Sequence, residues 1–135
     1  MNRPAPQDID IQVVTTYLPR HSRPDAGQHT FAYTITIHNH WDLPVQLLSR
    51  HWVITDADGD VQEVRGEGVV GEQPIIAPGS FFRYTSGATL PTPVGCMEGS
   101  YTFIVADDDD VDPTAQPAFE IPIPAFTLAM PNALH

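Results

Sequence analysis

The chain has 135 residues and carries 17 acidic residues against six arginines and no lysine, a formal net charge of -11. We therefore expect no nucleic-acid partner, because phosphate backbones are held by clustered lysine and arginine side chains. No apolar run approaches the about 20 residues that a membrane helix needs, and the first ten residues lack the apolar region of a signal peptide, so we expect a cytoplasmic protein with no membrane contact.

Length and cysteine content predict the domain organisation. A chain of this size buries roughly two-thirds of the surface of its unfolded form, which is enough for one hydrophobic core. We expect residues 1–8 to form a disordered N-terminal tail and residues 9–135 to fold as a single domain. Cys96 has no partner for an internal disulfide, and we expect a free thiol without a redox role.

The first half of the chain reads as strands, because apolar and polar residues alternate. Alternation predicts a strand over residues 9–18 and, most clearly, another over residues 30–39, in which Phe31, Tyr33 and Ile35 share one face. Residues 45–55 are apolar on both faces, which is typical of a central strand. Three polar residues, Ser49, Arg50 and His51, interrupt that strand.

Further strands are predicted in the second half, over residues 61–64, 81–85 and 100–105. The pair Asp58-Gly59 is a favoured hairpin turn before the first of them. In the last strand the apolar residues change phase, which predicts a bulge near Ala125. Pro122 and Pro124 cannot donate to a neighbouring strand, so this strand is expected at a sheet edge.

Together these elements predict the fold class. Seven or eight short strands, broken by 14 prolines and nine glycines and with no helix longer than two turns, describe an all-β, immunoglobulin or fibronectin III-like β-sandwich. Trp52 and Tyr33 are expected in its core. A small barrel is the alternative.

Several blocks of the sequence carry a family resemblance. The segments "PVQLLSRHWVITDADG", "GEGVVGEQPIIAPG", "YTSGATLPTPVGCMEGSY" and "IPAFTLAMPNALH" resemble the bacterial ApaG family, also called CorD, and the resemblance runs from about Ile9 to His135. It implies a fibronectin III-like fold in a cytosolic bacterial protein with no settled reaction. It also implies an association of the family with cobalt resistance and magnesium efflux, and, from related domains, a protein-interaction unit. The segments "VADDDDVDPTAQPAF" and "HNHWDLP" depart from the family pattern.

The glycines of "GEGVVG" have the G-x-G-x-x-G spacing of dinucleotide-binding loops. That motif needs a helix directly after the glycines, and Pro74 and Pro78 leave no room for one. We therefore predict that the loop does not bind dinucleotides and that its glycines supply positive φ angles or bulges between two strands. The alternative is a non-helical nest of backbone N–H groups that binds phosphate beside Arg65.

Acidic residues and histidines form three candidate metal sites. "DADGD" at residues 56–60 lacks the glycine and glutamate positions of a calcium loop, so we interpret it as a hairpin. Asp107–Asp110 is interpreted as a solvated loop that binds cobalt or magnesium weakly at best. His38 and His40 have a spacing that suits nickel, cobalt or zinc, but no third ligand is assured. We therefore assign no metal site and no cofactor.

Two functional hypotheses follow, and neither is enzymatic because no serine lies in a nucleophile motif. The favoured hypothesis is a protein-interaction module with an unknown protein partner, with a homodimer left open. The alternative is a binding protein for pyrophosphate, nucleotide or divalent cations. Val69 and Val70 either plug the end of the sandwich or face a partner, and two arginines rim that surface. The candidate contact residues are Arg65, Gly66, Gly68, Val69, Val70, Gly71 and Arg83.

Overall fold

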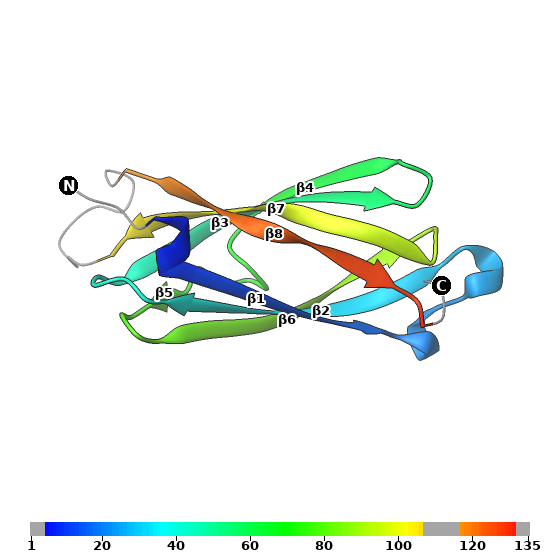
Figure 1. The fold of residues 1–135 in the computed structure, drawn as a ribbon, viewed down its shortest axis with the longest axis horizontal. Coiled ribbons are helices and arrows are strands. Elements are labelled where there is room, and N and C mark those ends of the chain that lie inside the picture. The colour runs from blue at the N-terminus through cyan, green and yellow to red at the C-terminus, as the bar shows by residue number, and fades with distance from the viewer. Residues whose placement is uncertain (1–4, 107–116, 132–135) are drawn as a thin grey trace.

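The computed structural model describes residues 5–106 and 117–131, and strands dominate it (Figure 1). The strands are β1 (Ile9–Tyr17), β2 (His29–Asn39), β3 (Val45–Asp56), β4 (Val61–Glu67), β5 (Ile75–Ile76), β6 (Phe81–Leu90), β7 (Val94–Val105) and β8 (Phe119–Ala129). Three single turns of 3-10 helix, η1 (Pro6–Asp8), η2 (Pro19–His21) and η3 (Pro24–Ala26), lie before β1 and between β1 and β2. None of the described helices is long and apolar enough to cross a membrane.

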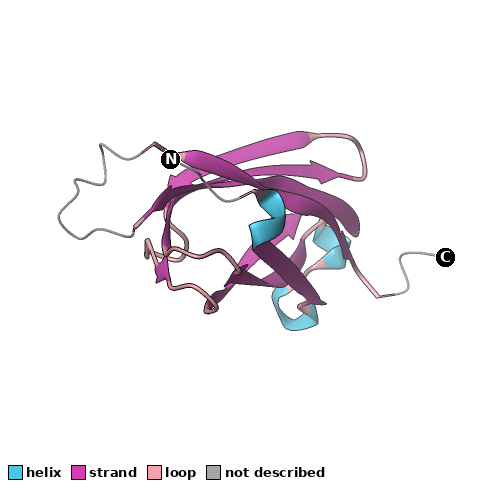
Figure 2. Ribbon diagram, turned by 60° about the vertical axis from the view of Figure 1, so that its left-hand side comes forward, coloured by secondary structure: helices cyan, strands magenta, loops and turns pink. Residues whose placement is uncertain are grey.

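The strands form two antiparallel sheets packed face to face, which confirms the predicted β-sandwich (Figure 2). The first sheet has the order β1-β2-β6. The second has the order β4-β3-β7-β8, and the short β5 pairs with the start of β3. On one side of the sandwich β1 contacts β8 (Figure 1). On the other side the edge strands β4 and β6 flank a hollow.

The core lies between the two sheets and is built from the inward face of each strand. In β2 every second residue from His29 to Asn39 is buried, as the alternation predicts. Trp52 and Tyr33 are both buried, as expected, and their rings meet edge to face with centroids 5.5 Å apart. Such aromatic pairs add stabilisation to the burial of their apolar surface.

The predicted bulge in the last strand is confirmed, as is the edge position of its prolines. The β7–β8 register pairs Met97 with Phe126 but Gly99 with Ile123, so β8 contains one extra residue around Pro124 and Ala125. β8 is the edge of its sheet, where a proline nitrogen that faces away from β7 costs no ladder hydrogen bond.

β3 differs from its prediction in one respect, because the polar residues do not interrupt it. The strand runs unbroken from Val45 to Asp56, and a bulge lies between Leu47 and Ser49 in its pairing with β7. The bulge shifts the phase of the strand. Leu47 faces inward before it, whereas Arg50 shares the inner face with Trp52 after it.

The acidic segment at residues 56–60 forms the predicted hairpin turn between β3 and β4. The Asp56 side chain accepts hydrogen bonds from the backbone N–H groups of Asp58 and Asp60, at 2.9 and 3.1 Å. Gly59 has a φ of 86°, a conformation that glycine adopts without strain. The carboxylate of Asp56 therefore stabilises the turn.

Candidate functional site: the glycine loop and the groove beside it

The glycine loop closes in a two-residue turn. The backbone groups of Val69 and Glu72 exchange hydrogen bonds of 2.8 and 2.9 Å, and Val70 and Gly71 between them have φ angles of 45° and 80°. The N–H of Gly68 donates to the Leu48 carbonyl at 2.7 Å. Three N–H groups of the loop are thus already bonded within the protein, and they are not free for a phosphate.

The two valines of the loop have opposite positions. Val69 is 1% exposed and packs into the core, whereas Val70 is 53% exposed. The same division occurs at β5, where Ile76 is buried and Ile75 is exposed. Each pair therefore plugs the end of the sandwich with one side chain and presents the other to solvent.

Val70 is strained, because a β-branched residue rarely adopts a positive φ. We predict that Val70→Gly stabilises the protein by about 0.5 to 1 kcal/mol, since glycine adopts this conformation freely but loses more backbone entropy on folding. The free energy of unfolding from urea titration measures the effect. Val69→Gly is the matched control and should destabilise, because it empties a buried position. A lower stability for Val70→Gly would show that the valine makes a stabilising contact that outweighs its strain.

The loop is tied to the bulge of β3 by backbone and side-chain hydrogen bonds. Leu48, the bulged residue, accepts the N–H of Gly68 and, at 2.9 Å, the side-chain amide of Gln73. A bulge leaves one residue without a ladder partner. The glycine loop supplies the missing donors, so the bulge and the loop form one structural unit.

Arg50 holds the other side of the loop from the inner face of β3. Its Nη1 donates to the carbonyl oxygens of Glu67 and Gly68, at 3.1 and 2.9 Å. Gly66, the partner of Arg50 in the β3–β4 ladder, makes this possible: a Cβ at Gly66 would lie 2.7 Å from that nitrogen. Gly66 therefore contributes the space that the guanidinium occupies in this position, and it does not supply a positive φ.

Two adjoining hollows lie between β4 and β6, and we call them together the β4–β6 groove. The hollow nearer the loop has a volume of about 270 Å³, and the farther one about 310 Å³. Both are lined by Tyr33, Arg50, Trp52 and Ser86. Val69, Val70 and Gly71 close the near hollow, whereas Gln62 and Val64 of β4 face Ser86–Thr89 of β6 across the far one.

The groove has one cation and aromatic walls, and the acidic residue Glu67 also lines its near hollow. Arg50 is the one basic side chain among the described residues that line it. Tyr84, on the wall of the near hollow, shares a hydrogen bond between hydroxyl groups with Tyr101. Burial raises the pKa of Tyr84 and that of Tyr101 well above the usual tyrosine value, so both hydroxyls stay neutral at physiological pH. The positive charge of Arg50 is therefore not balanced by these groups.

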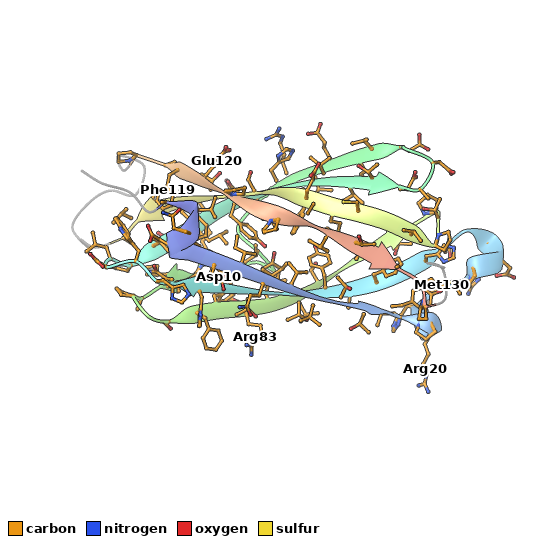
Figure 3. All side chains as sticks on the ribbon, in the orientation of Figure 1. Asp10, Arg20, Arg83, Phe119, Glu120 and Met130 are labelled. Atoms are coloured by element: carbon orange, nitrogen blue, oxygen red, sulfur yellow. The ribbon has the colours of Figure 1, made fainter. Side chains whose placement is uncertain are left out.

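Neither Arg65 nor Arg83 lines the β4–β6 groove, and Arg83 does not lie at the rim of the loop. Arg83 extends from the outer face of the β1-β2-β6 sheet, away from the other sheet (Figure 3), where it donates to Thr36 and lies over the Phe81 ring. Arg65 is 73% exposed and lies 4.0 Å from Glu63. The strand period explains the difference, because odd positions of β4 and β6 face outward.

The candidate metal sites gain no support from the described geometry. Among residues 5–106 and 117–131, no group of three or more histidine, cysteine or acidic side chains is placed to hold an ion. His38 and His40 lie edge to face with ring centroids 5.0 Å apart. Asp107–Asp110 lies outside the described residues. Cys96 is a half-buried free thiol on β7.

Comparison with known proteins decides the family. The family profile described as the ApaG domain matches residues 19–105, which contain β2 to β7, the glycine loop and Arg50. The chain belongs to the ApaG family. An ApaG protein of Ralstonia nicotianae is 56% identical over 128 residues, 95% of this chain and 97% of the relative. One of Methylococcus capsulatus is 53% identical over 133 residues, 98% and 99% of the two chains.

A solved structure supports the same conclusion for the ApaG fold. The crystal structure of the putative ApaA protein from Bordetella pertussis superposes with a TM-score of 0.84 at 47% sequence identity. The match covers 93% of this chain and 96% of that one. The fold of this chain is therefore shared with that relative over nearly the whole length of both chains.

Sequence reasoning found the glycine loop but missed the central residue of the site, Arg50. The signal was present: Arg50, Trp52 and Ile54 are spaced by two, which places all three on one face of a strand. An arginine on the face that carries a buried tryptophan has to reach a hydrogen-bond acceptor or a ligand. Ser86 was missed because the strand predicted at residues 81–85 ended too early, since β6 runs to Leu90. Tyr84 lies inside the predicted strand but was not singled out as a site residue.

Proposed function

We propose that this chain is a non-catalytic, cytosolic protein-interaction module that binds an extended peptide segment in the β4–β6 groove. One observation carries the proposal: the edge strands β4 and β6 each lack a neighbour on one side, and a hollow with aromatic walls lies between them. An edge strand offers a row of free N–H and C=O groups to an added strand, and hollows between the edges accept its alternate side chains.

The size and chemistry of the groove support a peptide rather than a reaction. Each hollow, about 270 or 310 Å³, is at or below the lower end of small-molecule pockets and suits single side chains. No histidine or cysteine lines either hollow in the described part of the chain. The exposed Val70 extends the apolar surface at the closed end.

A pull-down with groove variants tests the proposal. Ser86 lines both hollows, and we expect Ser86→Trp to fill the groove and reduce recovery of cytosolic partners about tenfold or more, as loss of a central contact does. Thr85→Trp is the matched control, because Thr85 is exposed on the outer face of the same strand. It should leave recovery unchanged. Amide NMR spectra verify that both variants fold.

Equal recovery with the two variants would place the partner on another surface and contradict the proposal. Running the pull-down with and without added cobalt or magnesium tests whether partner binding depends on the metals with which the family is associated. On our proposal the protein affects cobalt tolerance and magnesium efflux through its partner. Recovery that requires the metal would instead favour a role for bound cations.

A small-anion ligand is the second candidate function, because Arg50 brings positive charge to the groove. Titration with pyrophosphate and with ATP tests it directly. Binding that is lost in Arg50→Gln, but kept in Arg65→Gln, would favour this candidate over the peptide.

A further inference from the structure

We infer that the β4–β6 groove takes the C-terminal end of its partner, with the free terminal carboxylate bound by Arg50. This inference rests on the proposed function and adds to it the chemistry of the bound peptide. Three features carry it: the unused donors of Arg50, the closed end of the groove, and the direction of β6.

Arg50 lines both hollows of the groove and uses only one of its guanidinium nitrogens for hydrogen bonds within the described protein. Its Nη1 is held by the carbonyl oxygens of Glu67 and Gly68, and the missing side chain of Gly66 leaves room for the guanidinium in this position. Nε and Nη2 have no acceptor among the described residues. A guanidinium edge with two N–H donors matches the two oxygens of a carboxylate, and here its orientation is fixed before the ligand arrives.

The glycine loop forms one end of the groove, and Arg50 contacts the start of that loop. Val69, Val70 and Gly71 line the near hollow together with Arg50, and the Val69–Glu72 turn is held by two backbone hydrogen bonds. A peptide that reaches this turn cannot continue straight through it. The near hollow therefore favours a chain end over an internal segment.

We place the peptide on the edge of β6 rather than on that of β4, which runs the opposite way along the groove. For a peptide on β6, the direction of this strand determines which chain end arrives at the loop. Along β6, Tyr84 lines the near hollow and Thr89 the far one. All strand pairs of this protein that the structure describes are antiparallel, and antiparallel pairs are the commoner kind in general. A strand added antiparallel to β6 runs from Thr89 toward Tyr84. Its C-terminus then meets the loop and Arg50.

The net charge of the protein restricts the charge of the peptides that it can bind. With a net charge of -11, the protein repels strongly acidic segments and attracts basic ones. Glu67 adds a negative charge near the closed end. We therefore expect a neutral or basic peptide segment. The carboxylate that Arg50 binds is then the C-terminal carboxylate of that peptide and not an acidic side chain.

Peptide libraries provide the test. Random octapeptides are presented to the wild-type protein with a free C-terminal carboxylate and, in parallel, with a C-terminal carboxamide. We expect selection of free-acid peptides only. The best peptide should bind about tenfold or more weakly as its carboxamide, as expected for the loss of a charged hydrogen-bonded pair. Amide NMR shifts of β6 and the loop should report the bound position.

Arginine variants complete the test with the selected free-acid peptide. Arg50→Gln should lose about as much affinity as the carboxamide peptide does, because either change removes the same ion pair. Arg65→Gln, the same change on an exposed outward position, should bind as the wild type does. If Arg50→Gln does not fold, the comparison of acid and amide on the wild type still decides the question.

The outcomes separate this inference from the proposed function. If a peptide shifts the NMR signals of the β6 amides equally in its free-acid and carboxamide forms, the proposed interaction module stands. The inference that Arg50 binds a terminal carboxylate is then overturned. If amidated peptides bind through an internal aspartate or glutamate and need Arg50, the bound carboxylate comes from a side chain. That result overturns the inference that it comes from the C-terminus. Binding without any shift along β6 or the loop, or no binding from either library, overturns both proposals.

Discussion

Replacing Gly68 by alanine is expected to destabilise the protein by about 3 kcal/mol or more. Gly68 has a φ of 62°, which costs an L-residue about 1 to 2 kcal/mol. A Cβ there would also overlap the carbonyl oxygen of Glu72, the acceptor of the Val69 N–H. Because that oxygen belongs to the backbone, the overlap is relieved only by opening the turn. Urea titration of the free energy of unfolding measures the loss.

Gly71→Ala is the matched control within the same loop. Its φ is 80°, but no atom lies within 4 Å of a Cβ at this position. It should lose only about 1 kcal/mol, the cost of the backbone conformation alone. Equal losses at the two positions would show that the overlap with Glu72 is relieved without cost. The turn would then be far softer than its two hydrogen bonds indicate.

The protein is also expected to lose stability steeply in alkaline solution. Burial raises the pKa values of Tyr84 and Tyr101 in the folded state, whereas an exposed tyrosine in the unfolded chain ionises near pH 10. Below pH 10 both states keep the two protons and the stabilisation is complete. Above it only the unfolded chain releases them, so the free energy of unfolding falls by about 1.4 kcal/mol per pH unit for each tyrosine.

Urea titrations at a series of pH values from 9 upward measure this slope. The double variant Tyr84→Phe, Tyr101→Phe removes both hydroxyls together and leaves no unpaired one in the core. Its slope above pH 10 should be smaller by about 2.7 kcal/mol per pH unit, the share of the two tyrosines. An unchanged slope would mean that the two hydroxyls ionise in the folded protein as easily as in water.

Much of the sandwich was predictable because its strands obey a period of two. β2 shows the rule most clearly, and even the bulge of β8 was visible as a change of phase at Ala125. The bulge of β3 was not predicted, because Leu47 and Leu48 are both apolar and fit either face. Only the register with β7 shows that the phase changes there.

The candidate site was harder to predict, because its parts are distant in sequence. The glycine loop was identified, and of its two valines Val69 is buried whereas Val70 is exposed. The groove depends on β3, β4 and β6 meeting across the open side of the sandwich. Nothing local in the sequence specifies that meeting, so Arg65 and Arg83 were chosen in place of Arg50.

The contact between Arg50 and Gly66 has a consequence for how this sequence can change over evolution. The guanidinium occupies the volume of the missing side chain, so a change at one position alters what fits at the other. A lineage that gains a side chain at position 66 must move the guanidinium out of this volume and away from its present bonds to Glu67 and Gly68, or else replace the arginine. A lineage that loses the arginine no longer needs the glycine. The two positions should therefore covary across ApaG sequences, whereas Gly68, constrained by its own backbone, should stay glycine in both backgrounds.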